Sequence, residues 1–109
     1  MITILPMKQD SIKNLGLAED GLFGFAADSG EYCVCDGTPS IIALAVSPDT
    51  SVIDGLVRAA LARAVRENRL RVFIGKNVDK QALLQLGFID NIKDESINVP
   101  LVLGRGCKH

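Results

Sequence analysis

The stretch that decides the fold runs from Ser40 to Gly75 and reads SIIALAVSPDTSVIDGLVRAALARAVRENRLRVFIG. Its first part, Ser40–Ser47, is apolar without alternation, which is typical of a strand covered on both faces. Residues Val52–Asn68 carry apolar side chains at i, i+3, i+4 and i+7 spacing, which predicts an amphipathic helix. A second apolar run, Leu70–Gly75, predicts another strand. A strand, a helix and a strand in this order predict a right-handed crossover that makes the two strands parallel.

The residues before this stretch predict a strand, a short helix and a hairpin. We expect a strand over Ile2–Leu5 and a short helix within residues 8–18. Leu22–Ala27 and Glu31–Asp36 are predicted to form the hairpin, which turns at Gly30. These strands precede the crossover and are joined by short connections, so most of the sheet is expected to be antiparallel.

The starts and ends of the helices are also expected from particular residues. Thr50 or Ser51 can cap the long helix, and Asp54 stands three residues after Ser51, as in a capping box. Asn77 can cap a last short helix, and Gly87 stands where a glycine would end it.

Two further strands are predicted near the carboxyl end, over Phe88–Ile92 and Ile97–Leu103. Residues 104–109 are expected to be a flexible tail. Together the elements predict one α+β domain over residues 1–109, with a mixed, largely antiparallel sheet and helices on both faces in three layers.

Composition excludes several classes of function. A chain of 109 residues, 48% of them hydrophobic, can bury a core without disulfides or metal. A formal charge of −1 supplies no basic field for nucleic acid, so we predict no nucleic-acid partner. No apolar run approaches the ~20 residues of a membrane span, so we predict no membrane association. Three cysteines, an odd number, favour a reducing cytoplasm.

The cysteines and the single histidine can be combined into a four-ligand metal set. Its members would be Cys33, Cys35, Cys107 and His109. Structural zinc sites usually separate paired ligands by two to four residues in turns, and a chain end is a poor clamp. We therefore predict no metal site, and we expect Cys33 and Cys35 to be packing residues of a strand.

Three features in this order resemble the GNAT acyltransferase superfamily. A V-S-P sequence at Val46–Pro48 follows an apolar strand, a helix opens on that loop, and an L-G-F sequence stands at Leu86–Phe88. The resemblance covers about Leu22–Leu103. Within the superfamily, Ala82–Gln85 and Val99–Leu103 make the sequence most similar to the small amino-terminal domain of citrate lyase ligase.

The resemblance implies a GNAT-like fold that binds acetyl-CoA or CoA in a wedge between the Ser40–Ser47 and Leu70–Gly75 strands. Strand amides would hold the pantetheine and the acyl carbonyl. The helix start would receive the diphosphate, because its unpaired amides and the helix dipole favour an anion. The residues implied for cofactor contact are Leu44, Ala45, Val46, Ser51, Val52, Ile53, Asp54, Gly55 and Asn77.

The phosphate loop of this superfamily, R/Q-x-x-G-x-G/A, aligns with Val52–Val57, where Gly55 alone is retained. Asp49 and Asp54 add negative charge at the helix end that should attract the diphosphate. We therefore expect a low affinity for coenzyme A.

No residue is assigned a catalytic role from the sequence. The tyrosine that commonly donates a proton in this superfamily aligns with Leu83, and the only tyrosine is Tyr32, in a different strand. Glu31 and Asp36 are fallback candidates for a base.

Two functions from different classes are left open. One is an acetyl-CoA-dependent N-acetyltransferase with a degenerate phosphate loop, acting on an amine of a small molecule or a protein. The other is a non-catalytic binding or regulatory module resembling the detached amino-terminal domain of the ligase. The amine would enter past residues 8–25, where Asp10, Glu19 and Asp20 are the acids. We also expect a homodimer with Ile97–Leu103 near its interface.

Overall fold

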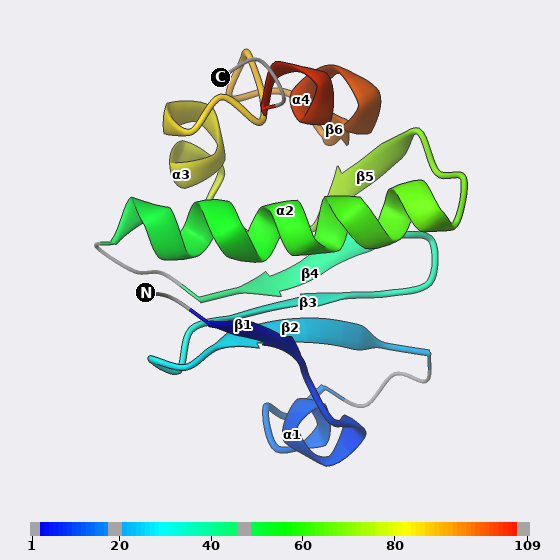
Figure 1. The fold of residues 1–109 in the computed structure, drawn as a ribbon, viewed down its shortest axis with the longest axis vertical. Helices are drawn as coiled ribbons and strands as arrows, with labels where there is room; N and C mark the ends of the chain where they lie inside the picture. The colour runs from blue at the N-terminus through cyan, green and yellow to red at the C-terminus, as the bar shows by residue number, and fades with distance from the viewer. Residues whose placement is uncertain (1–2, 18–20, 46–48, 107–109) are drawn as a thin grey trace.

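The computed structural model describes residues 3–17, 21–45 and 49–106 and places six strands and four helices in them (Figure 1). In chain order these elements are β1 (Ile4–Pro6), α1 (Gln9–Lys13), β2 (Phe23–Ala27), β3 (Tyr32–Cys35), β4 (Ser40–Leu44), α2 (Thr50–Arg66), β5 (Arg71–Ile74), α3 (Lys80–Gln85), β6 (Ser96–Asn98) and α4 (Val99–Gly106).

The six strands form one sheet, and their order in space is their order in the chain. Every neighbouring pair is antiparallel except β4 and β5, which are parallel because α2 carries the chain from the end of one strand to the start of the other. The predicted parallel pairing of the two strands and the α+β class with a mixed, largely antiparallel sheet are therefore confirmed.

The main core lies between α2 and one face of the sheet (Figure 1). Leu56 and Leu61 of α2 are fully buried there, against strand residues such as Ile41 and Val72. Residues of α3 and α4 extend the same core. The other face carries a smaller cluster, centred on Ile12 of α1. Helices thus cover both faces, but the layer formed by α1 is thin.

The predicted strands at the carboxyl end are wrong in two respects. Phe88–Ile92 is not a strand, and Ile97–Leu103 is divided between β6 and α4. The physical reason lies at Asn98, whose side-chain oxygen accepts a hydrogen bond from the Leu101 amide at 3.1 Å and so caps a helix. Pro100 stands in the first turn, where its missing N–H costs nothing.

Aspartates, rather than the predicted residues, cap α2 and α3. Asp49 accepts a hydrogen bond from the Ser51 amide at 3.0 Å, so neither Thr50 nor Ser51 is the cap and Asp54 is outside any capping box. Asp79 accepts from the Gln81 amide at 2.9 Å, which removes the predicted cap role of Asn77. Asp49 and Asp79 each stand directly before the first helical residue and have extended backbone, which is the position and conformation of an N-cap.

Both of these helices end in a residue of left-handed conformation. Gly87 has φ +82°, as predicted, and the Phe88 amide donates to the Leu83 carbonyl at 3.0 Å. At the end of α2 the same position is held by Asn68, with φ 59°, and the Arg69 amide donates to the Ala64 carbonyl at 2.8 Å.

Candidate functional site

The parallel strands β4 and β5 are paired over only two residues. Ser40 lies opposite Phe73 and Ile41 opposite Ile74, and the last bond runs from the Gly75 amide to the Ile41 carbonyl at 2.8 Å. Residues 42–44 continue beside β3, but no described residue of β5 is paired with them. We call the side of residues 42–44 that faces away from β3 the open edge of β4.

A β-bulge in β4 sets the direction of the backbone at the open edge. Cys35 pairs with Ile41 and Val34 with Ala43, so Ile42 is an extra residue in β4. Beyond the bulge, the Ala45 amide donates to the Tyr32 carbonyl at 2.9 Å. Backbone groups alternate sides along a strand, so the amide of the preceding residue, Leu44, faces the open edge. This is one of the amides that the sequence assigned to the acyl carbonyl.

Gly75 allows the backbones of β4 and β5 to come close at the last hydrogen bond between them. A Cβ atom at this position would lie 2.6 Å from the Ile41 carbonyl oxygen, closer than real Cβ contacts allow. Only glycine therefore permits the two backbones to approach at the last paired residue.

The start of α2 offers little to a ligand among the predicted contact residues. Ser51 is exposed, but its amide is already taken by the Asp49 side chain. The Val52 amide donates to the Asp49 carbonyl at 3.2 Å. The side chains of Val52 and Ile53 are only 3% and 2% exposed, so both belong to the core. These groups cannot also bind a diphosphate without rearrangement of the helix start.

Asp54 and Gly55 have structural partners of their own. The Arg58 guanidinium donates to the Asp54 carboxylate, with Nε and Oδ2 3.0 Å apart. A Cβ atom at Gly55 would lie 2.5 Å from Cδ1 of Ile4 in β1. The glycine that the resemblance assigned to phosphate binding therefore faces the movable end of the Ile4 side chain of β1.

The remaining predicted residues are scattered or lie outside the described ranges. Asn77 is exposed in the turn between β5 and α3, beside a shallow groove of about 710 Å³ whose rim includes Lys76 and Lys80. The sequence did not indicate this groove, although its two lysines are close in the chain. Asp10 is exposed on α1. The residues outside the described ranges are Val46, Glu19, Asp20, Cys107 and His109.

The structure places none of the aligned or fallback catalytic residues at the open edge. Leu83 is fully buried, and Tyr32 packs with the small cluster on the α1 face. Asp36 precedes β4, at the end of β3 away from Leu44. Glu31 immediately precedes Tyr32 of β3, whose carbonyl accepts from the Ala45 amide on the side of β4 opposite to the open edge.

Asp36 has a structural task at its own end of the sheet. Its carboxylate accepts hydrogen bonds from the amides of Thr38, at 3.0 Å, and Ser40, at 2.8 Å, and from the Thr38 hydroxyl. Partial burial by itself would raise the pKa of Asp36, but these hydrogen bonds outweigh burial and lower the pKa. The carboxylate therefore stays ionised at neutral pH and holds the turn before β4.

The two cysteines of β3 are core residues, as predicted. Cys33 and Cys35 are 0% and 1% exposed. Hydrogen bonding with Cys35, burial and the charge that Cys35 can carry raise the pKa of the Cys33 thiol well above its ordinary value. Cys33 therefore stays a neutral thiol and is a poor nucleophile. Among the described residues, no three His, Cys, Asp or Glu side chains are grouped so that they could hold a metal ion.

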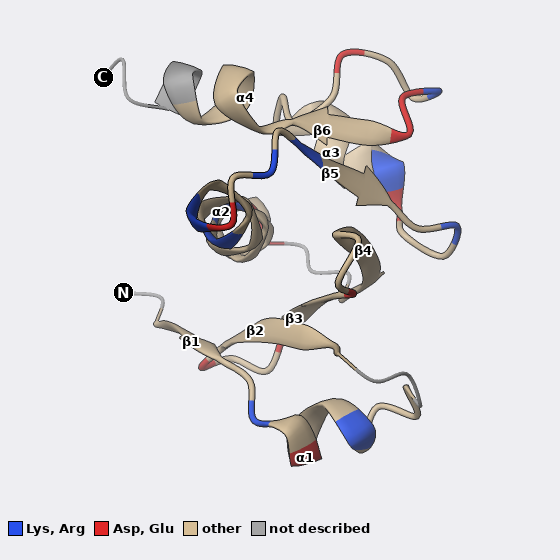
Figure 2. Ribbon diagram, turned by 90° about the vertical axis from the view of Figure 1, so that its right-hand side faces the viewer, with Lys and Arg blue, Asp and Glu red and all other residues tan. Residues whose placement is uncertain are grey.

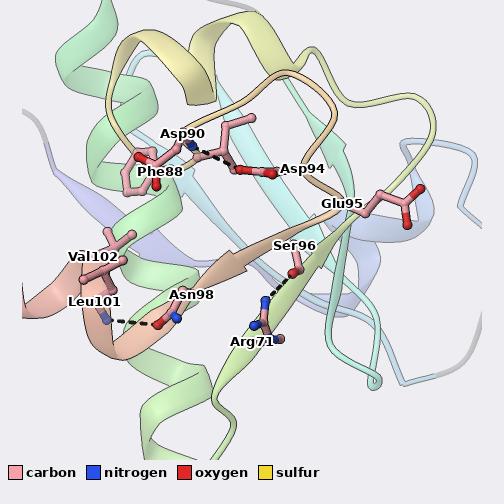
Figure 3. Close-up of a pocket in the computed structure, with 10 residues that line it drawn as sticks. Arg71, Phe88, Asp90, Asp94, Glu95, Ser96, Asn98, Leu101 and Val102 are labelled. Atoms are coloured by element: carbon pink, nitrogen blue, oxygen red, sulfur yellow. Dashed lines mark hydrogen bonds between the residues drawn. The ribbon is translucent and has the colours of Figure 1, made fainter.

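A separate small cavity of about 220 Å³ lies between β6 and the loop before it (Figure 3). Arg71 donates to the Ser96 hydroxyl at 3.0 Å, and the Asp94 carboxylate accepts from the Asp90 amide at 3.1 Å. Several polar groups of this cavity thus bind one another, and none of the predicted contact residues that the structure describes lines it.

Comparison of the chain with protein-family models, with curated proteins and with solved structures finds no match. In the part of the chain that is described, no helix has the length and apolar character needed to cross a membrane.

Proposed function

We propose that the domain binds acetyl-CoA or a related thioester at the open edge of β4 and transfers the acyl group to an amine. The observation that supports this best is the early end of the β4–β5 pairing, which leaves the Leu44 amide directed away from β3. The resemblance to the GNAT superfamily assigns the acyl carbonyl to amides of this strand. An amide donor at the carbonyl oxygen would stabilise the negative charge that develops there during transfer.

The reaction needs few protein groups. The amine nitrogen forms a bond to the thioester carbon, the carbon–sulfur bond breaks, and a proton of the amine ends on the sulfur. Holding the two reactants together can supply a large part of the rate. The side chain of Leu83 has no proton to donate, and Tyr32 packs on the α1 face, so neither serves as the acid. We therefore expect a transferase slower by about 10²–10⁴ than one with a positioned proton donor.

The diphosphate of coenzyme A does not fit the start of α2 as it stands. Asp49 occupies the amides, Val52 is buried, and both Asp49 and Asp54 carry negative charge. Binding would therefore depend on the pantetheine arm, with a low affinity for the whole cofactor.

A second candidate function is a non-catalytic binding or regulatory module. The closed start of α2 favours it, because a domain that no longer binds a diphosphate has no need of open amides there. The buried Leu83 favours it too, since it stands where the superfamily commonly has its proton donor.

Calorimetry with two thioesters tests the proposal. Acetyl-CoA and acetyl-pantetheine, which lacks the diphosphate, should bind with dissociation constants within about tenfold of each other. Asp49→Asn keeps the cap and removes the charge. This variant should lower the dissociation constant of acetyl-CoA about two- to fivefold, which is the usual size of a charge effect at a helix end. The dissociation constant of acetyl-pantetheine should not change.

A matched pair of variants tests the location. Ala45→Leu places a larger side chain next to the open edge and should abolish binding of both thioesters and any turnover with an amine panel. Ala62→Leu makes the same change at an exposed position of α2 and should affect neither. No binding of either thioester at millimolar concentration would overturn the proposal, whereas binding without turnover would leave only the second candidate.

A further inference from the structure

The carboxyl-terminal end of α2 borders an apolar groove at the opposite end of the helix from the open edge of β4. The groove has a volume of about 420 Å³ and is lined by Val65, Asn68, Arg69, Leu70, Pro100 and Leu103. Its lining residues come from the end of α2, the turn after it and α4. Helix α4 packs against α2 (Figure 2). We call it the α2–α4 groove.

Large apolar side chains remain exposed at this groove. Leu70 is 71% exposed and Val65 is 48% exposed. The backbone of Leu70 is held in place, since its carbonyl accepts a hydrogen bond from the Val99 amide at 3.1 Å. Apolar surface gathered in one place on fixed backbone is typical of an interaction site.

The charge around the groove is positive. Arg69 lines it, and Arg66 is exposed in the last turn of α2. The ion pairs of α2 within the described ranges join Asp54 to Arg58 and Arg63 to Glu67, so Arg69 at the groove and Arg66 near it are available to a carboxylate. Among the residues that the structure describes, no acidic side chain lines the groove.

We propose that the α2–α4 groove docks an acidic amphipathic helix of a partner protein. Such a helix would insert apolar residues at i, i+3, i+4 and i+7 spacing between α2 and α4, and its carboxylates would meet Arg66 and Arg69. A second copy packed groove to groove would instead place these arginines against their counterparts, which costs energy. The proposal is independent of the thioester site, because the groove lies at the other end of α2.

Two synthetic peptides test the charge requirement on the full chain. One 18-residue peptide carries leucine at helical i, i+3, i+4 and i+7 positions and glutamate elsewhere, and the other carries lysine in place of glutamate. Fluorescence anisotropy should show binding of the glutamate peptide at least tenfold tighter than of the lysine peptide. The difference should shrink at high salt, because exposed charges are screened.

Four variants test the location. Leu70→Ser and Arg69→Glu should each weaken binding of the glutamate peptide at least fivefold. Leu5→Ser and Lys13→Glu make the same changes at exposed positions of β1 and α1 and should leave binding unchanged. All four positions are exposed, so circular dichroism should show a folded protein in each case.

Several results would overturn the proposal. Equal binding of the two peptides, or equal loss in the control variants, would show that the groove does not select an acidic helix. Two alternative occupants have their own readouts. Flotation with vesicles of anionic phospholipid that is lost in Leu70→Ser would indicate a membrane surface. A dimer in sedimentation that is lost in the same variant would indicate a second copy, as expected from Ile97–Leu103.

Discussion

The two ends of α2 differ in charge, in burial and in what lies beside them. At the amino-terminal end, Asp49 caps the helix and Val52 turns into the core next to the open edge of β4. At the carboxyl-terminal end, Asn68 ends the helix, Arg66 and Arg69 are exposed, and Leu70 is left largely uncovered.

The comparison of the two ends shows which features of a helix end indicate a ligand-binding site. Acids at the start and bases at the end of a helix both stabilise it through the helix dipole, so the charges alone need no ligand. Capped amides at the start are likewise explained by the helix itself. Helix stability does not explain the 71% exposure of Leu70, so among the described residues at the two ends of α2 this leucine is the feature that points to a ligand.

The largest expected effect comes from placing one arginine at each end of α2. Val52→Arg would bury an unpaired charge and should lower the free energy of unfolding by at least about 3 kcal/mol. Val65→Arg, at a position 48% exposed, should change it by less than about 0.5 kcal/mol. Urea unfolding followed by circular dichroism measures both. Equal stability of the two variants would mean that Val52 faces solvent and that the helix start is open to phosphate.

Loss of the Asp49 cap at the amino-terminal end should cause the next largest decrease in the free energy of unfolding. Asp49→Ala removes the acceptor for the Ser51 amide and should cost about 1 kcal/mol in the same urea experiment. Asp49→Asn keeps an acceptor and should cost only a few tenths of a kcal/mol. If the two variants lose the same stability, the charge rather than the hydrogen bond is what Asp49 contributes.

Substitutions of Asn68, the left-handed residue after α2, should change thermal stability in opposite directions. Asn68 has φ 59°, a conformation that asparagine tolerates better than alanine and glycine adopts without strain. Asn68→Ala should lower the midpoint of thermal unfolding, by a free energy below about 1 kcal/mol, and Asn68→Gly should raise it slightly. A lower midpoint for the glycine variant would show that the asparagine side chain makes a contact worth more than the strain.

The ion pairs along α2 should give the smallest difference between its two halves. Asp54 precedes Arg58 by four residues, the favourable order, whereas Arg63 precedes Glu67. Asp54→Ala should therefore cost about 0.3–0.5 kcal/mol at low salt, and Glu67→Ala should cost less. Both losses should fade in 1 M NaCl. A larger loss for Glu67→Ala would contradict this ranking.

The parts of the fold that local signals determine could be predicted from the sequence. The apolar run of β4, the periodicity of α2 and the glycine at Gly30 each act within a few residues, and the crossover and hairpin they predict are present. The run Ile97–Leu103 was misread because valine and leucine suit either a strand or a helix. The single cap at Asn98 decides for a helix after β6, and such a cap is visible only once the backbone around it is known.

The candidate site was less predictable than the fold, for two different reasons. The bulge at Ile42 that directs the Leu44 amide depends on register with β3, which no local pattern in β4 encodes. The burial of Val52 and Ile53, by contrast, follows from the apolar periodicity of α2. The alignment with a phosphate loop predicted instead that both residues contact a ligand. Their burial shows that the apolar periodicity was the better guide to their position.

Gly75 stands at a seam in the sheet. Four antiparallel strands lie on one side of it and two on the other, and only two paired residues of β4 and β5 join them directly. Because α2 packs against β1, β2 and β3 as well as β5, the helix bridges the two parts where the sheet itself is thin. Local opening at the seam should therefore be less costly than global unfolding, and deuterium should replace the amide hydrogens of Phe73 and Gly75 before those between β2 and β3.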